Sequence, residues 1–186
     1  SLSINKKNIK IVTKKLLTEN FETFKSVESA ITSLDKSYVF FNSTPPKEHF
    51  LTSKLILNSG FNLIVEKPIC VSNLQYSILK KIANKKGLFL FENMMYFFSK
   101  QFFLFNEEIK NLEKLKKIEI IFSIPKFNPN SFRNSHDVEN SLLYDVGCYP
   151  MSLISFLQIN LAKMKLNFKK KNRILSDLKI SALSKK

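Results

Sequence analysis

Glycine is scarce in this chain, which has three glycines among its 186 residues. They stand at positions 60, 87 and 147, so no G-x-G-x-x-G string occurs. A dinucleotide site normally needs that turn, because the backbone must approach the pyrophosphate closely. The chain therefore either binds no dinucleotide, or the strand–helix unit that carries such a turn precedes Ser1.

Long apolar runs and targeting segments are also missing from the sequence. No run approaches the roughly 20 apolar residues of a membrane-spanning helix. The first residues, SLSINKK, lack the apolar centre of a secretory signal. We therefore expect a cytoplasmic protein that does not enter a membrane. The chain also lacks an initiator methionine, so we expect it to be part of a longer protein.

Cysteine is rare, and its two positions, Cys70 and Cys148, match no metal-binding or redox spacing. We interpret both as small hydrophobic residues in or near a core. Two isolated thiols fit a reducing, cytoplasmic setting, and no metal site is predicted.

Acidic residues are few: 15 Asp and Glu stand against 30 Lys and Arg, which gives a formal net charge of +15. Such a charge suggests a nucleic-acid-binding module. The lysines are spread along the chain, however, and arginine, the usual reader of bases, occurs only at 133 and 173. A coding bias toward Lys, Asn, Ile and Phe explains the charge without a function. We expect no nucleic-acid partner, and keep the basic module as an alternative.

Strand and helix signals alternate through the first half of the sequence with short connections. The pattern predicts strands at 38–42, 62–66 and 88–92, and helices at 6–18, 47–58 and 72–85. Such alternation is typical of right-handed βαβ units and a parallel sheet.

The second half does not continue the regular alternation of strands and helices. It predicts a helix at 99–112, a strand at 117–125, a polar loop at 126–141, an apolar helix at 142–157 and two strands near 166–168 and 178–183. The fold class is therefore α/β, with a nucleotide-binding type of parallel sheet followed by part of an α+β domain.

The stretch from Asn62 to Pro68 carries the strongest hint of chemistry. Leu63, Ile64 and Val65 form a short apolar run of the kind that a parallel sheet buries on both faces. Glu66 and Lys67 follow at the carboxyl end of the strand, where ligands bind in open α/β sheets. The sequence thus predicts a lysine at a ligand-facing edge.

Three motifs occur in order along the chain: S-T-P-P-K-E-H at 43–49, E-K-P at 66–68 and Y-D-V-G-C-Y-P at 144–150. Their order and elements resemble the glucose-fructose oxidoreductase / inositol dehydrogenase family (Gfo/Idh/MocA), whose members are NAD(P)-dependent oxidoreductases. The segment 91–96 and the pair Phe132-Arg133 also stand where related members carry similar residues.

The resemblance implies a partial Rossmann domain at 1–96 and a partial substrate and oligomerisation domain at 97–186, with a mostly antiparallel sheet. It implies a chain that begins at the second Rossmann strand and ends before the second sheet is complete. Such a fragment would bind cofactor poorly and be weakly active or inactive alone. The intact protein would form a homo-oligomer.

The resemblance also implies the catalytic residues. Lys67 would stabilise negative charge on the oxygen of a ketone during hydride transfer. Tyr149 would act as general acid or base, helped by the nearby cation, and Asp145 would bind substrate hydroxyls. Glu66 would position Lys67 and the cofactor ribose. The alternatives are a solvated Glu–Lys pair, a helix N-terminal Asp and a packed Tyr.

Cofactor contacts are implied for Thr44, Pro45, Pro46 and His49. Without the resemblance, the two prolines would be an ordinary turn. His49 could then simply pack on the helix that follows it.

The choice between NADP and NAD depends on the end of the second Rossmann strand, which the resemblance places at Ser3. A hydroxyl at Ser3 with Lys6 and Lys7 nearby suits a 2′-phosphate, so NADP is favoured over NAD, unless these lysines are a solvated helix start. Arg133 would contact a cofactor or substrate phosphate, or be a loop cation, and His136 is expected to face solvent.

One departure concerns the segment 137–143, where many family members are rich in glycine and this chain is not. The D-V-G-C-Y-P string is closest to the branch that acts on diols, pentoses and nucleotide-linked keto-sugars. The resemblance implies a small, sugar-like substrate, with a non-catalytic binding or regulatory relative as the alternative.

Overall fold

A computed structural model describes residues 10–12, 22–110, 119–120, 138–159, 161–171 and 174–184. Several residues named in the sequence predictions lie outside these ranges: Ser3, Lys6, Lys7, Arg133 and His136.

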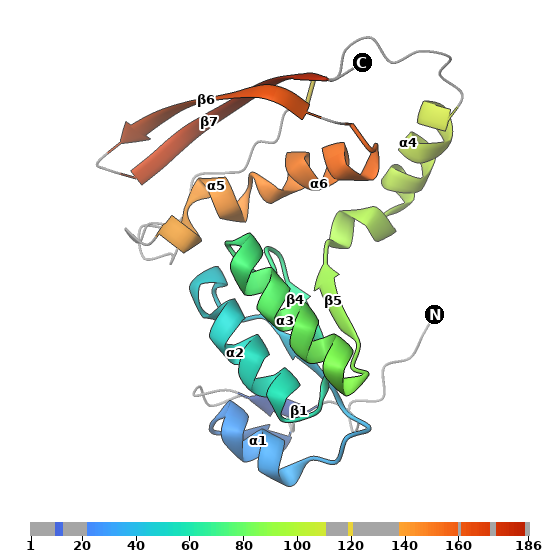
Figure 1. Cartoon of the computed structure of the whole chain (residues 1–186), viewed down its shortest axis with the longest axis vertical. Coiled ribbons are helices and arrows are strands. Elements are labelled where there is room, and N and C mark those ends of the chain that lie inside the picture. The colour runs from blue at the N-terminus through green and yellow to red at the C-terminus, as the bar shows by residue number, and fades with distance from the viewer. Residues whose placement is uncertain are drawn as a thin grey trace.

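A three-stranded parallel sheet forms the centre of the described structure. Its order is β3 (Val39–Asn42), β4 (Asn62–Glu66) and β5 (Leu90–Asn93), with both neighbours of β4 parallel to it. Figure 1 shows the helices between these strands packed beside the sheet. The predicted fold class is confirmed: the chain is an α/β protein with part of a Rossmann-type sheet.

Two helices, α2 (Pro46–Asn58) and α3 (Asn73–Lys86), connect the strands, and local signals set their ends. Gly60 follows α2 at φ 82°, and Gly87 ends α3 at φ 62°, a left-handed conformation that glycine adopts without steric cost. Ser72 caps α3 by accepting a hydrogen bond from the Gln75 amide. The side-chain oxygen of Gln75 accepts a hydrogen bond from the Val71 amide at 3.1 Å.

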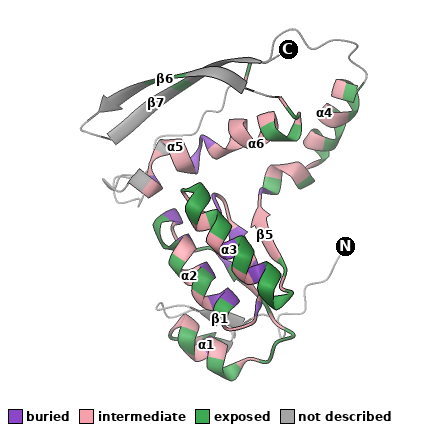
Figure 2. Ribbon diagram, in the orientation of Figure 1, coloured by how far each residue is buried: buried purple, intermediate pink, exposed green. Residues whose placement is uncertain are grey.

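The main core lies between the sheet and these helices, and Figure 2 shows its buried positions on α2, α3 and β4. Along β4 burial alternates, because Leu63 and Val65 are fully buried and Ile64 is half-buried. The prediction of a strand buried on both faces is therefore wrong for Ile64. Burying each large apolar side chain contributes about 1.5–3 kcal/mol. The cluster consists of Ile56, Leu57, Phe61, Leu63, Val65, Ile69, Leu79 and Ala83.

The N-terminal part corrects one prediction. Residues 10–12 form a strand, β1 (Lys10–Val12), parallel to β2 (Glu22–Phe24), where a helix over 6–18 was expected. Ile11 and Val12 are β-branched and favour extended backbone, and the pairing with β2 overrides the helical spacing. The helix α1 (Val27–Ser33) follows, with Ser26 and Ser29 capping its start.

The second half holds helices and a hairpin of two long strands. Figure 1 shows the antiparallel pair β6–β7 lying above α5 and α6. The predicted strand at 117–125 is not seen at Glu119 and Ile120, and its other residues lie outside the described ranges. Among the described helices, none is long and apolar enough to cross a membrane. The elements are η2 (Met95–Phe98), α4 (Lys100–Lys110), η4 (Val138–Asn140), α5 (Leu142–Asp145), α6 (Cys148–Phe156), β6 (Leu161–Lys171) and β7 (Ile174–Ser184).

The predicted helix over 142–157 is broken into α5 and α6 by a turn at Val146 and Gly147. At this turn a Cβ on Gly147 would lie 2.3 Å from the carbonyl oxygen of Leu143. Only glycine permits this approach. The break places Asp145 at the end of one helix and Tyr149 in the first turn of the next.

We therefore expect Gly147→Ala to destabilise the protein by about 1–3 kcal/mol, the usual cost of forcing an added carbon into packed structure. In an ordinary helix the same change would stabilise the protein by about 0.5–1 kcal/mol. The sign of the change in the free energy of unfolding therefore tests the close approach at Gly147. Urea unfolding measures it, with the exposed helical change Ser77→Ala as a control expected within about 0.5 kcal/mol. A stabilised Gly147→Ala protein would contradict the close approach.

Candidate active site

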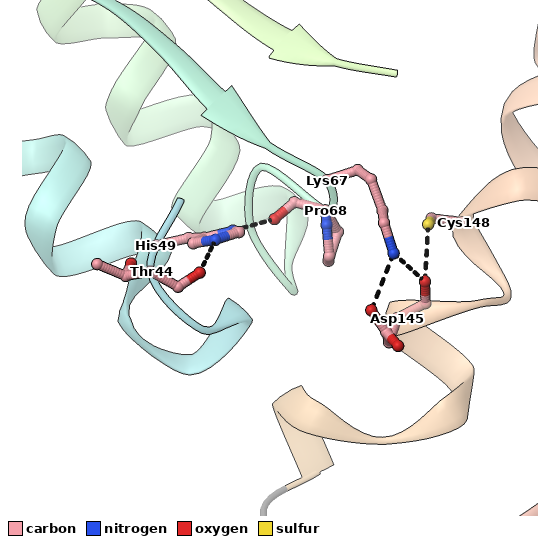
Figure 3. A network of polar contacts seen from close by, with 6 residues as sticks. All are labelled: Thr44, His49, Lys67, Pro68, Asp145 and Cys148. Atoms are coloured by element: carbon pink, nitrogen blue, oxygen red, sulfur yellow. Dashed lines mark hydrogen bonds and ion pairs between the residues drawn. The ribbon is translucent and has the colours of Figure 1, made fainter. Parts of the chain in front are cut away.

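An ion pair joins the sheet to the helical second half. The ammonium nitrogen of Lys67, just past the end of β4, lies 2.8 Å from Oδ1 of Asp145 and 2.5 Å from the Asp145 carbonyl oxygen. The side chains are 12% and 6% exposed. Figure 3 shows Lys67 reaching across to the end of α5. Two residues from separate predicted motifs are thus in direct contact.

Tyr149 completes this group. The Lys67 ammonium stands 4.8 Å from the centroid of the Tyr149 ring, a cation–π arrangement. The Tyr149 ring also lies 5.8 Å from that of Tyr96, whose hydroxyl pairs with Ser152 at 2.9 Å. The structure therefore brings Lys67, Asp145 and Tyr149 together.

Charge and burial compete at Lys67. Burial lowers the pKa of the ammonium, but the hydrogen bond to Asp145 and its negative charge outweigh that effect, and the pKa of Lys67 is raised above its usual value. Lys67 is consequently a fixed cation at neutral pH.

The environment of Asp145 was not anticipated. The residue is 4% exposed and its carboxylate is bonded to Lys67, where the sequence predicted contacts with substrate hydroxyls. The two residues belong to separate motifs 78 residues apart, and no local pattern signals that they pair.

The T-P-P segment after β3 is held by a buried asparagine. Asn42, 3% exposed, accepts hydrogen bonds from the Thr44 hydroxyl at 2.8 Å and the Thr44 amide at 3.3 Å. Its amide donates to Ser53 at 3.1 Å and to the His49 carbonyl at 3.3 Å. Thr44 and Pro45 are half-buried at the carboxyl edge of the sheet, whereas Pro46 is buried at the start of α2.

His49 lies deeper than the predicted cofactor contact implied. It is 1% exposed, with Nδ1 2.7 Å from the Pro68 carbonyl oxygen and Nε2 2.6 Å from the Thr44 carbonyl oxygen. The ring therefore links the loop after β3 to the turn after β4 (Figure 3). The Lys67–Pro68 peptide bond in this turn is cis.

Two carboxylates at the ends of β4 and β5 fix the same edge. Glu66 accepts a hydrogen bond from the side-chain amide of Asn93 at 2.5 Å, and Glu92 accepts one from the backbone amide of Ile69 at 2.7 Å. Glu92 and Asn93 were not assigned roles from the sequence. The sequence feature that could have identified Glu92 was an acidic residue near the end of a strand that lies parallel to β4.

Cys148 lies beside the ion pair, and its thiol contacts the Asp145 carbonyl oxygen at 3.5 Å. Burial raises the pKa of Cys148 to about 11, although Lys67 works in the opposite direction. Burial also raises the pKa of Cys70. Both thiols are half-buried and protonated at neutral pH, as expected for packing cysteines.

A cleft of about 470 Å³ adjoins the site at the start of α3. Its size falls within the range of small-molecule pockets. Within the described ranges, no group of three or more His, Cys, Asp or Glu could hold a metal ion. The cleft is lined by Ile69, Cys70, Val71, Ser72, Asn73, Tyr76, Leu90, Glu92 and Tyr144.

Parallel strands with helical crossovers, and polar side chains gathered at the strands' carboxyl ends, define a Rossmann-type α/β protein. No protein-family model matches the chain. A curated relative, dTDP-3,4-didehydro-2,6-dideoxy-alpha-D-glucose 3-reductase from Streptomyces violaceoruber, is 24% identical over 115 residues, which are 61% of this chain and 34% of that protein.

Solved oxidoreductases share the fold. An oxidoreductase from Bacillus cereus superposes with a TM-score of 0.72 at 18% identity, covering 92% of this chain and 52% of that one. A 3-ketoreductase from Actinomadura kijaniata, in complex with NADP and TDP-benzene, gives a TM-score of 0.65 at 21% identity, covering 78% and 46%. The chain thus spans about half of these structures and about a third of the curated relative.

The ion pair predicts a stability change. Lys67→Met leaves the Asp145 carboxylate buried opposite a thioether, and removing one partner of a buried pair costs about 3–5 kcal/mol. The pKa of Lys67 is raised in the folded state. Its contribution to the stability of the folded protein is therefore complete below the pKa of an unfolded lysine, and is lost as the pH rises through the folded-state pKa. In urea unfolding, the difference in free energy of unfolding between wild type and Lys67→Met should be constant from about pH 7 to about pH 9. It should shrink above about pH 10.5.

The control is the exposed pair of Lys110 with Glu107, whose charged atoms lie 2.7 Å apart and whose side chains are 60% and 67% exposed. Lys110→Met should change stability by at most about 0.5 kcal/mol. Equal losses in the two methionine variants would contradict the assignment of the Lys67–Asp145 pair as buried and stabilising.

The thiol of Cys148 should be poorly reactive. Relative to an unperturbed thiol of pKa 9, a pKa of about 11 lowers the thiolate fraction near pH 8, so iodoacetamide should react about 100-fold more slowly. A Cys70→Ser background isolates this signal, and the urea-unfolded chain provides the reference rate. Lys67→Met should slow the reaction further, because Lys67 lowers this pKa. Native and unfolded rates that agree would overturn the prediction.

Proposed function

We propose that this chain belongs to an NAD(P)-dependent oxidoreductase that interconverts a carbonyl and a carbinol on a sugar, keto-sugar or polyol. The single observation that carries the proposal is the meeting of Lys67, Asp145 and Tyr149 from two distant segments at the carboxyl edge of a Rossmann-type sheet. The shared fold with solved oxidoreductases supports it.

Lys67 would act on the substrate oxygen. A lysine ammonium has three donors, and Asp145 takes two of them with its carbonyl and carboxylate oxygens. The third is the one we assign to the carbonyl oxygen of the substrate, which gains negative charge as hydride arrives. Because the cation is already fixed, stabilising that charge needs little reorganisation.

Tyr149 would deliver or accept the proton. Its ring lies against the Lys67 ammonium, so a substrate oxygen at the cation comes within reach of the phenol by a small displacement. A positioned general acid contributes about 100-fold or more to the rate. In the reverse direction the same oxygen would accept the proton from the alcohol.

The described residues fit the nicotinamide-ribose end of a dinucleotide. Polar groups of Thr44 and Glu66 stand at the ends of neighbouring strands, where they suit ribose and amide groups. When bound, a nicotinamide cofactor supplies or accepts the hydride. None of the described residues forms a glycine-rich turn for the diphosphate. The proposal includes NADP or NAD, with NADP favoured.

The substrate class and organisation are part of the same proposal. The curated relative is a reductase of a dTDP-linked keto-sugar, and the solved 3-ketoreductase was crystallised with TDP-benzene. We infer a nucleotide-linked or free keto-sugar as substrate and membership of the Gfo/Idh/MocA family. The proposed cofactor domain is 1–96 and the substrate and oligomerisation domain 97–186, in a cytoplasmic homo-oligomer.

The test follows NADPH and NADH oxidation with a panel of keto-sugars, using the complete product of the gene. Tyr149→Phe removes one hydroxyl and should lower kcat by about 100-fold or more, with KM little changed. Lys67→Met should lower kcat by about 100-fold or more at temperatures where it remains folded.

Tyr38→Phe is the matched control, because Tyr38 directly precedes β3, at the amino end of the strand, and carries no proposed role in the reaction. It should retain kcat within a few-fold. Full activity in both Tyr149→Phe and Lys67→Met would show that the site assignment is wrong.

A further inference from the structure

The backbone that follows Lys67 is held at one peptide unit. The Pro68 carbonyl oxygen lies 2.7 Å from Nδ1 of His49, and the Ile69 amide nitrogen lies 2.7 Å from Oε1 of Glu92. These are the two polar atoms of the unit that joins Pro68 to Ile69. The same peptide is therefore bonded by a side chain of α2 on its oxygen and by one of β5 on its nitrogen.

The bonding partners fix the protons of His49. A carbonyl oxygen only accepts, so the bond to Pro68 needs a proton on Nδ1. The Thr44 carbonyl, 2.6 Å from Nε2, needs one there as well. Each nitrogen of the ring therefore faces its own backbone carbonyl oxygen.

We propose that His49 and Glu92 are positioning residues for Lys67, acting on it through the Pro68–Ile69 peptide unit, and that His49 does not contact a cofactor. At 1% exposure, with each ring nitrogen facing a carbonyl, His49 presents no polar edge to a ligand. A donor on the oxygen and an acceptor on the nitrogen polarise the same peptide, so each bond strengthens the other. The unit is thereby anchored to α2 and β5.

The functional meaning of this inference rests on the proposed role of Lys67, but its test does not use activity. Two variants separate the two bonds of His49. Asparagine places its amide nitrogen near the position of Nδ1, and glutamine places it near Nε2. His49→Asn therefore preserves the donor to Pro68 and loses the one to Thr44, whereas His49→Gln does the reverse.

The readout is the rate at which Lys67 is acetylated by limiting acetic anhydride, followed by mass spectrometry on the 186-residue chain. His49→Gln should raise this rate about tenfold, the factor that loss of one buried hydrogen bond produces. His49→Asn should leave it within about twofold of wild type. Lys85, exposed at the end of α3, reports general reactivity and should not change.

Glu92 provides a second, independent pair. Glu92→Gln retains an acceptor for the Ile69 amide, whereas Glu92→Leu removes it, so only the leucine variant should expose Lys67 to acetylation.

Two results would overturn the proposal: equal acetylation of Lys67 in the asparagine and glutamine variants of His49, or no effect of Glu92→Leu. An inactive enzyme with the expected labelling pattern would instead reject the proposed function and leave the positioning role intact.

Discussion

The contact between Lys67 and Asp145 is the constraint on which the described site depends. It spans 78 residues of sequence and joins the end of a parallel strand to a helix of the second half. Both ions are largely removed from water, and such a pair is favourable only when its geometry and further hydrogen bonds compensate the loss of hydration. The surrounding structure supplies that geometry: Gly147 lets the chain turn tightly behind Asp145, and the turn after β4 aims Lys67 at it.

The carboxyl edge of the sheet is stiffened by side chains that bond backbone atoms. Asn42 holds the loop after β3, His49 ties that loop to Pro68, and Glu92 holds the next amide. Loops at this edge have no strand ladder of their own, so their carbonyl and amide groups need other partners. Among the described residues no buried side-chain nitrogen or oxygen is left without a hydrogen bond. The edge is thereby held by hydrogen bonds within the chain itself.

Local signals predicted the strands and helices between Val39 and Asn93 well, because proline, glycine and serine mark their ends. The sequence also singled out Lys67, Asp145 and Tyr149. It missed the strand at Lys10–Val12, where pairing with a distant segment decides the structure, and the break at Gly147, where a close backbone approach does. It could not pair Asp145 with Lys67, since ion pairs across elements leave no local pattern.

The pairing of Lys67 with Asp145 has two opposing effects on the proposed chemistry. A carboxylate beside the ammonium weakens its field at a substrate oxygen, which lowers its value as an electrophile. The same carboxylate raises the pKa of Lys67 against the effect of burial, so the side chain keeps its charge in a largely buried site. An immobile donor also needs no reorganisation when charge develops. A fixed, partly neutralised cation is therefore more useful here than a mobile, fully charged one.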